Sequence, residues 1–104
     1  MDLQRSLARA TVALALCAAT PVFADQALAQ KNGCMACHGV DKKIVGPAYK
    51  DVAAKYKGDA KALAHLETVI HQGGKGVWGQ VAMPPQTKLS AGDVKALAQW
   101  VLSL

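Results

Sequence analysis

From residue 49 onward, apolar residues recur at intervals of three and four, the spacing of a helix with one buried face. One such set ends before Gly58. A second follows Asp59, a candidate N-cap, and ends at Gly73. A third follows Ser90, which resembles the start of a capping box with Asp93. In chain order, the sets are Tyr49, Val52, Ala53 and Tyr56; Leu63, Leu66 and Ile70; and Val94, Leu97, Ala98, Val101 and Leu102.

A shorter helix is expected over residues 26–32, with Gly33 easing the bend that follows it. Residues 73–88 are rich in glycine and proline and lack a helical period, so they are expected to form an extended loop. No stretch is typical of a strand. The pattern therefore predicts an all-α domain of about four helices, with the first and last in contact because each has an apolar face to cover.

Residues 1–24 have the features of an export signal that is cleaved after Ala24. Arg5 and Arg9 precede 15 uncharged residues, 10–24, which end in Val22-Phe23-Ala24. A membrane-spanning helix is the alternative, but it needs about 20 apolar residues. Lipid attachment at Cys17 is disfavoured because Leu16 is large. We therefore expect a periplasmic protein whose mature part, residues 25–104, is a single domain.

Charge in the mature part comes from ten lysines and six acidic residues, a net +4. The lysines are scattered and no arginine remains, which disfavours nucleic-acid binding. A basic surface that steers docking onto an acidic protein partner is the better interpretation.

The pentapeptide Cys34-Met35-Ala36-Cys37-His38 has the spacing of covalent c-type haem attachment. Cys34 and Cys37, on one tight turn, would each add to a haem vinyl group, and His38 would ligate the iron as proximal histidine. A structural zinc site would need four Cys or His ligands, and no second pair of cysteines follows. A redox dithiol would be expected among alternating strands and helices. Both alternatives are therefore weaker than one covalently bound haem c.

An iron held by one histidine has a sixth position, and its ligand separates an electron carrier from an enzyme or gas sensor. Met83 stands in the non-helical stretch before Pro84-Pro85, whose backbone is stiff. Met35 lies inside the attachment turn and cannot reach the other face. Met83 as a space-filling core residue stays open as an alternative. The remaining candidates are His65, His71 and the lysines, and both histidines are expected to be exposed.

Four motifs together resemble the small bacterial class I cytochromes c, most closely the c-551/c-552 type. They are C-M-A-C-H, I-V-G-P-A-Y-K-D-V-A-A-K-Y, G-V-W-G-Q-V-A-M-P-P-Q and L-A-Q-W-V-L-S, in that order over residues 25–104. The resemblance implies Met83 as the distal thioether ligand. It also implies that the Pro47 carbonyl accepts the free ring N–H of His38, and that the Trp78 indole donates to a haem propionate. Val69 departs from the family, where a basic residue often stands near a propionate.

The resemblance implies a soluble, monomeric carrier of single electrons, not an enzyme and not stably inserted in a membrane. It would pass electrons from a quinol-oxidising complex to a terminal reductase or oxidase, such as a nitrite reductase. A five-coordinate haem enzyme or gas sensor, and a haem subunit of one oxidoreductase, are the alternatives. The expected docking surface is apolar at its centre and rimmed by lysines: Met35, Ala36, Ile44, Ala82, Pro84 and Pro85, with Lys42, Lys43, Lys75 and Lys88.

Overall fold

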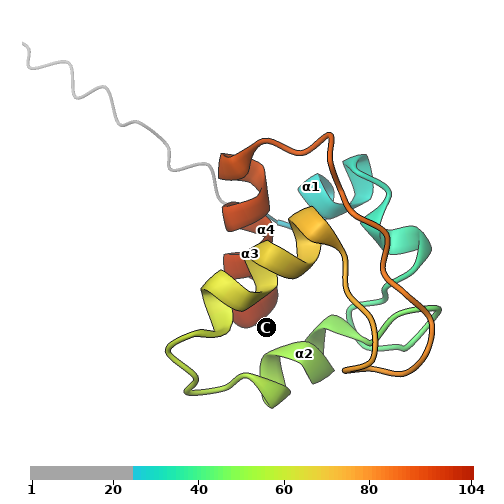
Figure 1. The fold of residues 1–104 in the computed structure, drawn as a ribbon, viewed down its shortest axis with the longest axis vertical. Coiled ribbons are helices and arrows are strands. Elements are labelled where there is room, and N and C mark those ends of the chain that lie inside the picture. The colour runs from blue at the N-terminus through green and yellow to red at the C-terminus, as the bar shows by residue number, and fades with distance from the viewer. Residues whose placement is uncertain (1–24) are drawn as a thin grey trace, which may run out of the picture.

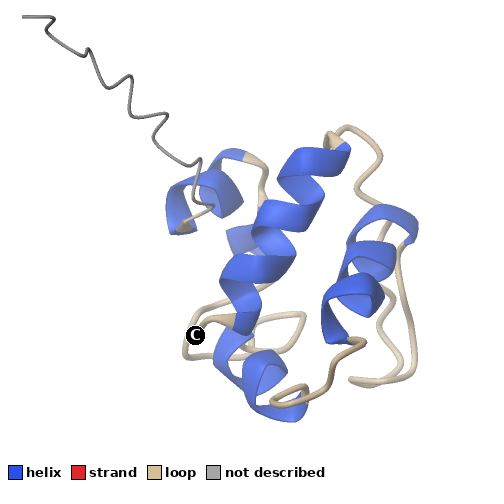
Figure 2. Cartoon of the chain, turned by 90° about the vertical axis from the view of Figure 1, so that its left-hand side faces the viewer, coloured by secondary structure: helices blue, strands red, loops and turns tan. Residues whose placement is uncertain are grey.

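The computed structural model describes residues 25–104, and the signal peptide expected over residues 1–24 lies outside this part of the chain. The described residues form helices and loops, with no strand (Figures 1 and 2). The prediction of an all-α domain is therefore confirmed. No helix within 25–104 has the length and apolar character needed to cross a membrane. The elements are α1 Gln26–Lys31, the 3-10 turn η1 Cys34–Ala36, α2 Tyr49–Lys55, α3 Ala62–Gln72 and α4 Ala91–Leu102.

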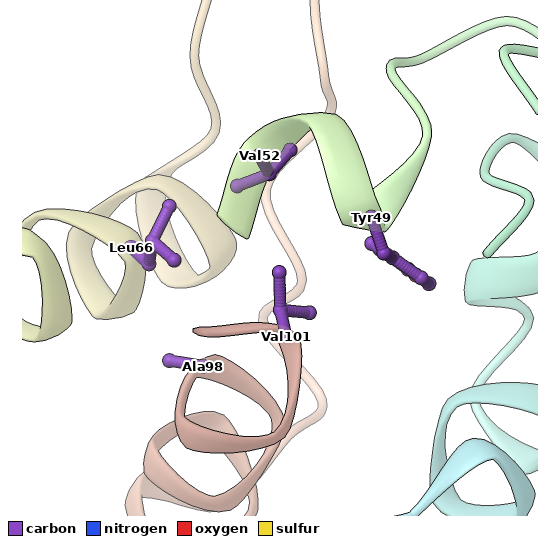
Figure 3. Packing of buried hydrophobic residues seen from close by; sticks show 5 residues of the cluster. All are labelled: Tyr49, Val52, Leu66, Ala98 and Val101. Atoms are coloured by element: carbon purple, nitrogen blue, oxygen red, sulfur yellow. The ribbon is translucent and has the colours of Figure 1, made fainter. Parts of the chain in front are cut away.

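Helix α4 is the element on which α2 and α3 both pack. Its start is fixed by Ser90, whose hydroxyl oxygen accepts a hydrogen bond from the Asp93 N–H at 3.1 Å, as the capping pattern predicts. The predicted apolar stripe faces the core, with four of its members buried. Together with Leu66 of α3 and Tyr49 and Val52 of α2, Ala98 and Val101 form one core cluster (Figure 3).

A second core cluster joins the two ends of the described chain. Ala29 of α1 is fully buried and packs with Val94 and Leu97 of α4 and with Leu89 of the preceding loop. The expected contact between the first and last helices is therefore confirmed. Trp100 of α4 packs against both clusters.

The predicted start of the third helix is wrong by a few residues. Helix α3 begins at Ala62, and Lys61, not Asp59, is its N-cap. The Asp59 carboxylate instead accepts a hydrogen bond from the Lys61 N–H at 2.8 Å, and the Asp59 carbonyl oxygen accepts one from the Ala62 N–H at 3.1 Å. An aspartate side chain can either cap a helix or accept a hydrogen bond from the backbone N–H two residues later, and Asp59 does the second. Asp59 thus closes a turn before the helix.

A long loop leads from α3 to α4 and is seen in orange in Figure 1. Gly73 ends α3 with φ +82°, and Gly74 and Met83 exchange two backbone hydrogen bonds of 3.1 and 2.8 Å. Further on, the Gln86 N–H donates to the Ile70 carbonyl oxygen at 2.9 Å, which ties the loop back to α3. The predicted loop is therefore extended, with its two arms paired at Gly74 and Met83 and its end tied to α3 at Ile70.

Candidate functional site

The two cysteines lie on and directly after the turn η1. Gly33 enters this turn with φ +75°, a conformation that favours glycine. The Cys37 and His38 N–H groups both donate to the Cys34 carbonyl oxygen, at 3.2 and 3.0 Å. Cys34 is half-buried and Cys37 is exposed. Burial raises the pKa of the Cys34 thiol, which disfavours its thiolate form.

The imidazole of His38 has a defined tautomer. Its Nδ1 lies 2.8 Å from the Pro47 carbonyl oxygen. A carbonyl oxygen can only accept a hydrogen bond, so Nδ1 must carry the proton. In the neutral ring, the other nitrogen, Nε2, then has its lone pair free, which is the form of histidine that binds a metal.

The loop that brings Pro47 to His38 is held by the attachment turn itself. The Val45 and Gly46 N–H groups both donate to the Cys37 carbonyl oxygen, at 3.0 and 2.7 Å. After Pro47, the Tyr49 N–H donates to the Gly39 carbonyl oxygen at 2.9 Å, where α2 begins. The turn, the histidine and the Gly46-Pro47 segment are thus one hydrogen-bonded unit.

Met83 is positioned by backbone contacts on both sides of its chain segment. Its N–H and C=O groups are both bonded to Gly74. Gly73, at the end of α3, lies against the same segment: a Cβ atom there would be 2.6 Å from the Met83 carbonyl oxygen and 3.1 Å from the Pro85 nitrogen. Only glycine at position 73 therefore allows the Met83 segment to approach the end of α3 this closely.

All six predicted site residues line a single cavity of ≈ 270 Å³. Apolar side chains from three helices form much of its wall, among them Val52, Leu66, Ile70, Leu97 and Val101. Val69, the position that departs from the family, also lines it. The six site residues brought together here are Cys34, Cys37, His38, Pro47, Trp78 and Met83.

This donor set fits a covalently attached haem. Two thiols, an imidazole with a free Nε2 and a thioether surround an apolar space that suits a porphyrin, and such nitrogen and sulfur groups are the usual haem ligands. Trp78 is partly exposed at this cavity, with the Lys55 ammonium 5.7 Å from the centre of its ring.

Two features of the site were not predicted from the sequence. Tyr49 was expected only as a core position of a helix, yet its ring also stacks on His38. Its place two residues after Pro47 was the available signal. His65 is exposed, as expected, but its Nε2 lies 3.1 Å from the Tyr56 hydroxyl, and both residues line the cavity.

Comparison with known proteins agrees with this donor set. The family model for cytochrome c matches residues 25–104. The chain belongs to the cytochrome c family. Cytochrome c-551 of Allochromatium vinosum is 54% identical over 90 residues, which cover 86% of this cytochrome and 96% of its relative. Cytochrome c-552 of Nitrosomonas europaea is 51% identical over 92 residues, 88% of this cytochrome and 89% of its relative.

A solved structure shows the same fold. The crystal structure of wild-type Nitrosomonas europaea cytochrome c552 aligns with a TM-score of 0.75 at 52% identity, over 77% of this cytochrome and 99% of that chain. The predicted resemblance to the c-551/c-552 type is therefore confirmed.

Family membership settles the cofactor and the class of activity. Cytochromes c hold haem c covalently through two cysteines, and this chain provides Cys34 and Cys37 at the required spacing. Its relatives are electron carriers rather than enzymes. This protein is accordingly a small electron-carrier cytochrome.

Proposed function

We propose that this cytochrome carries single electrons with His38 and Met83 as the two axial ligands of its haem iron. The observation that supports this most is that His38, whose Nδ1 is bonded to Pro47 so that the neutral ring has Nε2 free, lines the same apolar cavity as Met83 and the two cysteines. When bound, the haem supplies a one-electron couple of iron. With both axial positions taken by the protein, no site is left for a substrate.

The protein's own groups set the reduction potential under this proposal. A thioether from Met83 favours the ferrous state and raises the potential. The apolar wall excludes water and disfavours the extra charge of the ferric state. The Pro47 carbonyl oxygen orients His38 and increases its basicity, as acceptors behind a metal-bound histidine commonly do. Trp78 donates its indole N–H to a haem propionate.

Both proposed ligands are held in place by hydrogen bonds within the protein. His38 is bonded to Pro47, whose loop is bonded to Cys37, and Met83 is bonded twice to Gly74. These contacts do not depend on the charge of the iron. Little structure therefore needs to rearrange when an electron arrives or leaves, which favours fast transfer.

The cellular setting forms part of the same proposal. Residues 1–24 direct export to the periplasm, where the mature domain works as a monomer between a quinol-oxidising complex and a terminal reductase or oxidase, such as a nitrite reductase. Its docking surface is centred on exposed apolar residues of the loops that carry Pro47 and Met83: Ile44 is 54% exposed, and Ala82, Pro84 and Pro85 are exposed as well. Lysines around this centre steer acidic partners and act mainly on the association rate.

Two matched methionine variants test the ligation. Met83→Leu and Met35→Leu each remove one sulfur at nearly constant volume, and Met35 is a half-buried core residue. We expect the ferric wild type and M35L to show the weak sulfur-to-iron absorption band near ~695 nm, and M83L to lack it. If M83L kept the band, Met83 would not be the ligand. A high-spin wild type that binds carbon monoxide or cyanide readily would instead indicate an enzyme or sensor.

A further inference from the structure

The ring of Tyr49 lies against the ring of His38. Their centroids are 4.9 Å apart and their planes differ by 17°, so the two rings are stacked. Tyr49 is itself held in place by the core, because it is only 7% exposed and its ring meets the ring of Trp100 edge-on. The centroids of these two rings are 5.2 Å apart and their planes differ by 72°. The Tyr49 backbone is itself bonded to Gly39. The tyrosine ring therefore offers His38 a fixed surface.

The hydrogen bond to Pro47 alone does not fix the plane of the imidazole. It restrains one atom, Nδ1, which lies close to the axis of the Cβ–Cγ bond, so a modest turn of the ring about that bond lengthens the hydrogen bond only slightly. A flat surface stacked on the ring removes this rotation, since turning would drive the imidazole edge into the tyrosine. Gly46 limits movement further, because even a Cβ at that position would lie 2.9 Å from Nδ1 and 3.0 Å from Nε2.

We propose that Tyr49 is a positioning residue for His38, and that its ring fixes the plane in which the imidazole presents Nε2 to the haem iron. The inference rests on the proposed ligation by His38. The aromatic face provides the effect, so the hydroxyl group is not required for it. An apolar side chain of similar volume would fill the core equally well but would not hold the plane.

Three variants of the haem-loaded protein separate these roles. Tyr49→Phe keeps the ring, and Tyr49→Leu removes it but still fills the core. Tyr56→Leu is the matched control, because it makes the same change at another ring that lines the cavity but pairs with His65 rather than His38. Tyr49→Met, with a flexible space-filling side chain, serves as the ring-free variant if Y49L does not retain haem.

Two nuclear magnetic resonance measurements report on the imidazole. In the reduced protein, exchange of the His38 Nδ1 proton with solvent measures how well the ring is held. In the oxidised protein, the spread of the haem methyl shifts follows the orientation of the axial ligand planes, because that orientation distributes the unpaired spin. Y49L should exchange the proton about tenfold faster, the scale of one lost aromatic pair, and should change the methyl pattern. Y49F and Y56L should match the wild type.

Each other outcome has a defined meaning. A Y49L protein with wild-type exchange and methyl shifts would overturn the proposal. So would equal changes in Y49F, which would assign the effect to the hydroxyl, or in Y56L, which would indicate general loosening of the core. Failure of the ligation itself is visible beforehand, since the His38 ring protons of the oxidised wild type would then lack shifts from the iron.

Discussion

Gly46 lies so close to His38 that no other residue fits between this loop and the imidazole. A Cβ atom at position 46 would overlap the ring, with Nδ1 and Nε2 at 2.9 and 3.0 Å. Gly46 does not have a positive φ, so its backbone conformation does not require glycine. Glycine is required here by the close contact with His38, the proposed iron ligand.

Gly46→Ala should therefore destabilise the haem-loaded protein. Overpacking a tight site costs about 1–3 kcal/mol, and we expect a loss of this size in denaturant unfolding followed by haem absorbance. Gly92→Ala is the control, because a Cβ there would meet only the Ser90 hydroxyl oxygen, at 4.0 Å, near the start of α4. It should change stability by at most about 1 kcal/mol, in the favourable direction. Equal stability of G46A and the wild type would contradict the overlap.

Gly73→Ala should displace Met83. The added methyl group would meet the Met83 carbonyl oxygen at 2.6 Å, at a residue with φ +82°. Gly58→Ala has nearly the same backbone strain, φ +78°, but no atom within 4 Å of the added Cβ. We expect both variants to lose stability, while only G73A weakens the band near ~695 nm that marks sulfur ligation. The same spectral change in G58A would mean that strain alone, not the Met83 contact, is responsible.

Ser90→Ala should remove the N-cap of α4, on which α2 and α3 pack. The lost hydrogen bond to the Asp93 N–H should lower the free energy of unfolding by about 1 kcal/mol. Ser103→Ala, which removes a hydroxyl that donates to the Trp100 carbonyl oxygen after the end of the same helix, should have a smaller effect because that oxygen also accepts a hydrogen bond from the Ser103 N–H at 3.0 Å. Thermal unfolding of the two variants side by side gives the comparison, and an equal loss would argue against the cap.

Tyr49 also predicts a pH dependence of stability. Burial is the main reason that its pKa is raised above the usual value of about 10. The unfolded chain therefore loses this proton at lower pH than the folded chain does. The contribution of Tyr49 should be complete below about pH 10 and should decline above it. Denaturant unfolding between about pH 8 and 11 should show a steeper loss for the wild type than for Y49F; parallel curves would contradict the prediction.

Periodicity was sufficient to predict α2, α3 and α4, because each of them buries one apolar face. It placed the faces of α2 and α4 correctly, with Val52 and Val101 buried as expected. It failed at the start of α3, where the Asp59 side chain can bond either to a helix N-terminus or to its own turn. Both choices satisfy the same local chemistry, so the sequence alone does not decide between them.

The candidate site was predictable only where its chemistry follows chain spacing. The Cys34, Cys37 and His38 motif is local, and the roles of Pro47, Met83 and Trp78 came from family resemblance. The stacking of Tyr49 on His38 joins residues eleven positions apart through a turn of particular shape. The pairing of Gly74 with Met83 likewise depends on the path of an irregular loop. Neither contact leaves a periodic trace in the sequence.

The paired backbone groups of Gly74 and Met83 also divide the long loop into two parts with different freedom to evolve. Residues 75–82 form a closed ring outside the pairing, so an insertion or deletion after Trp78 is absorbed within that ring. Residues 83–89 run from the pairing to the buried Leu89. Both ends of this segment are fixed, so it cannot accommodate an insertion or deletion in the same way. Related chains should accordingly vary in length at the tip of the loop and keep a constant length between the methionine and the last helix.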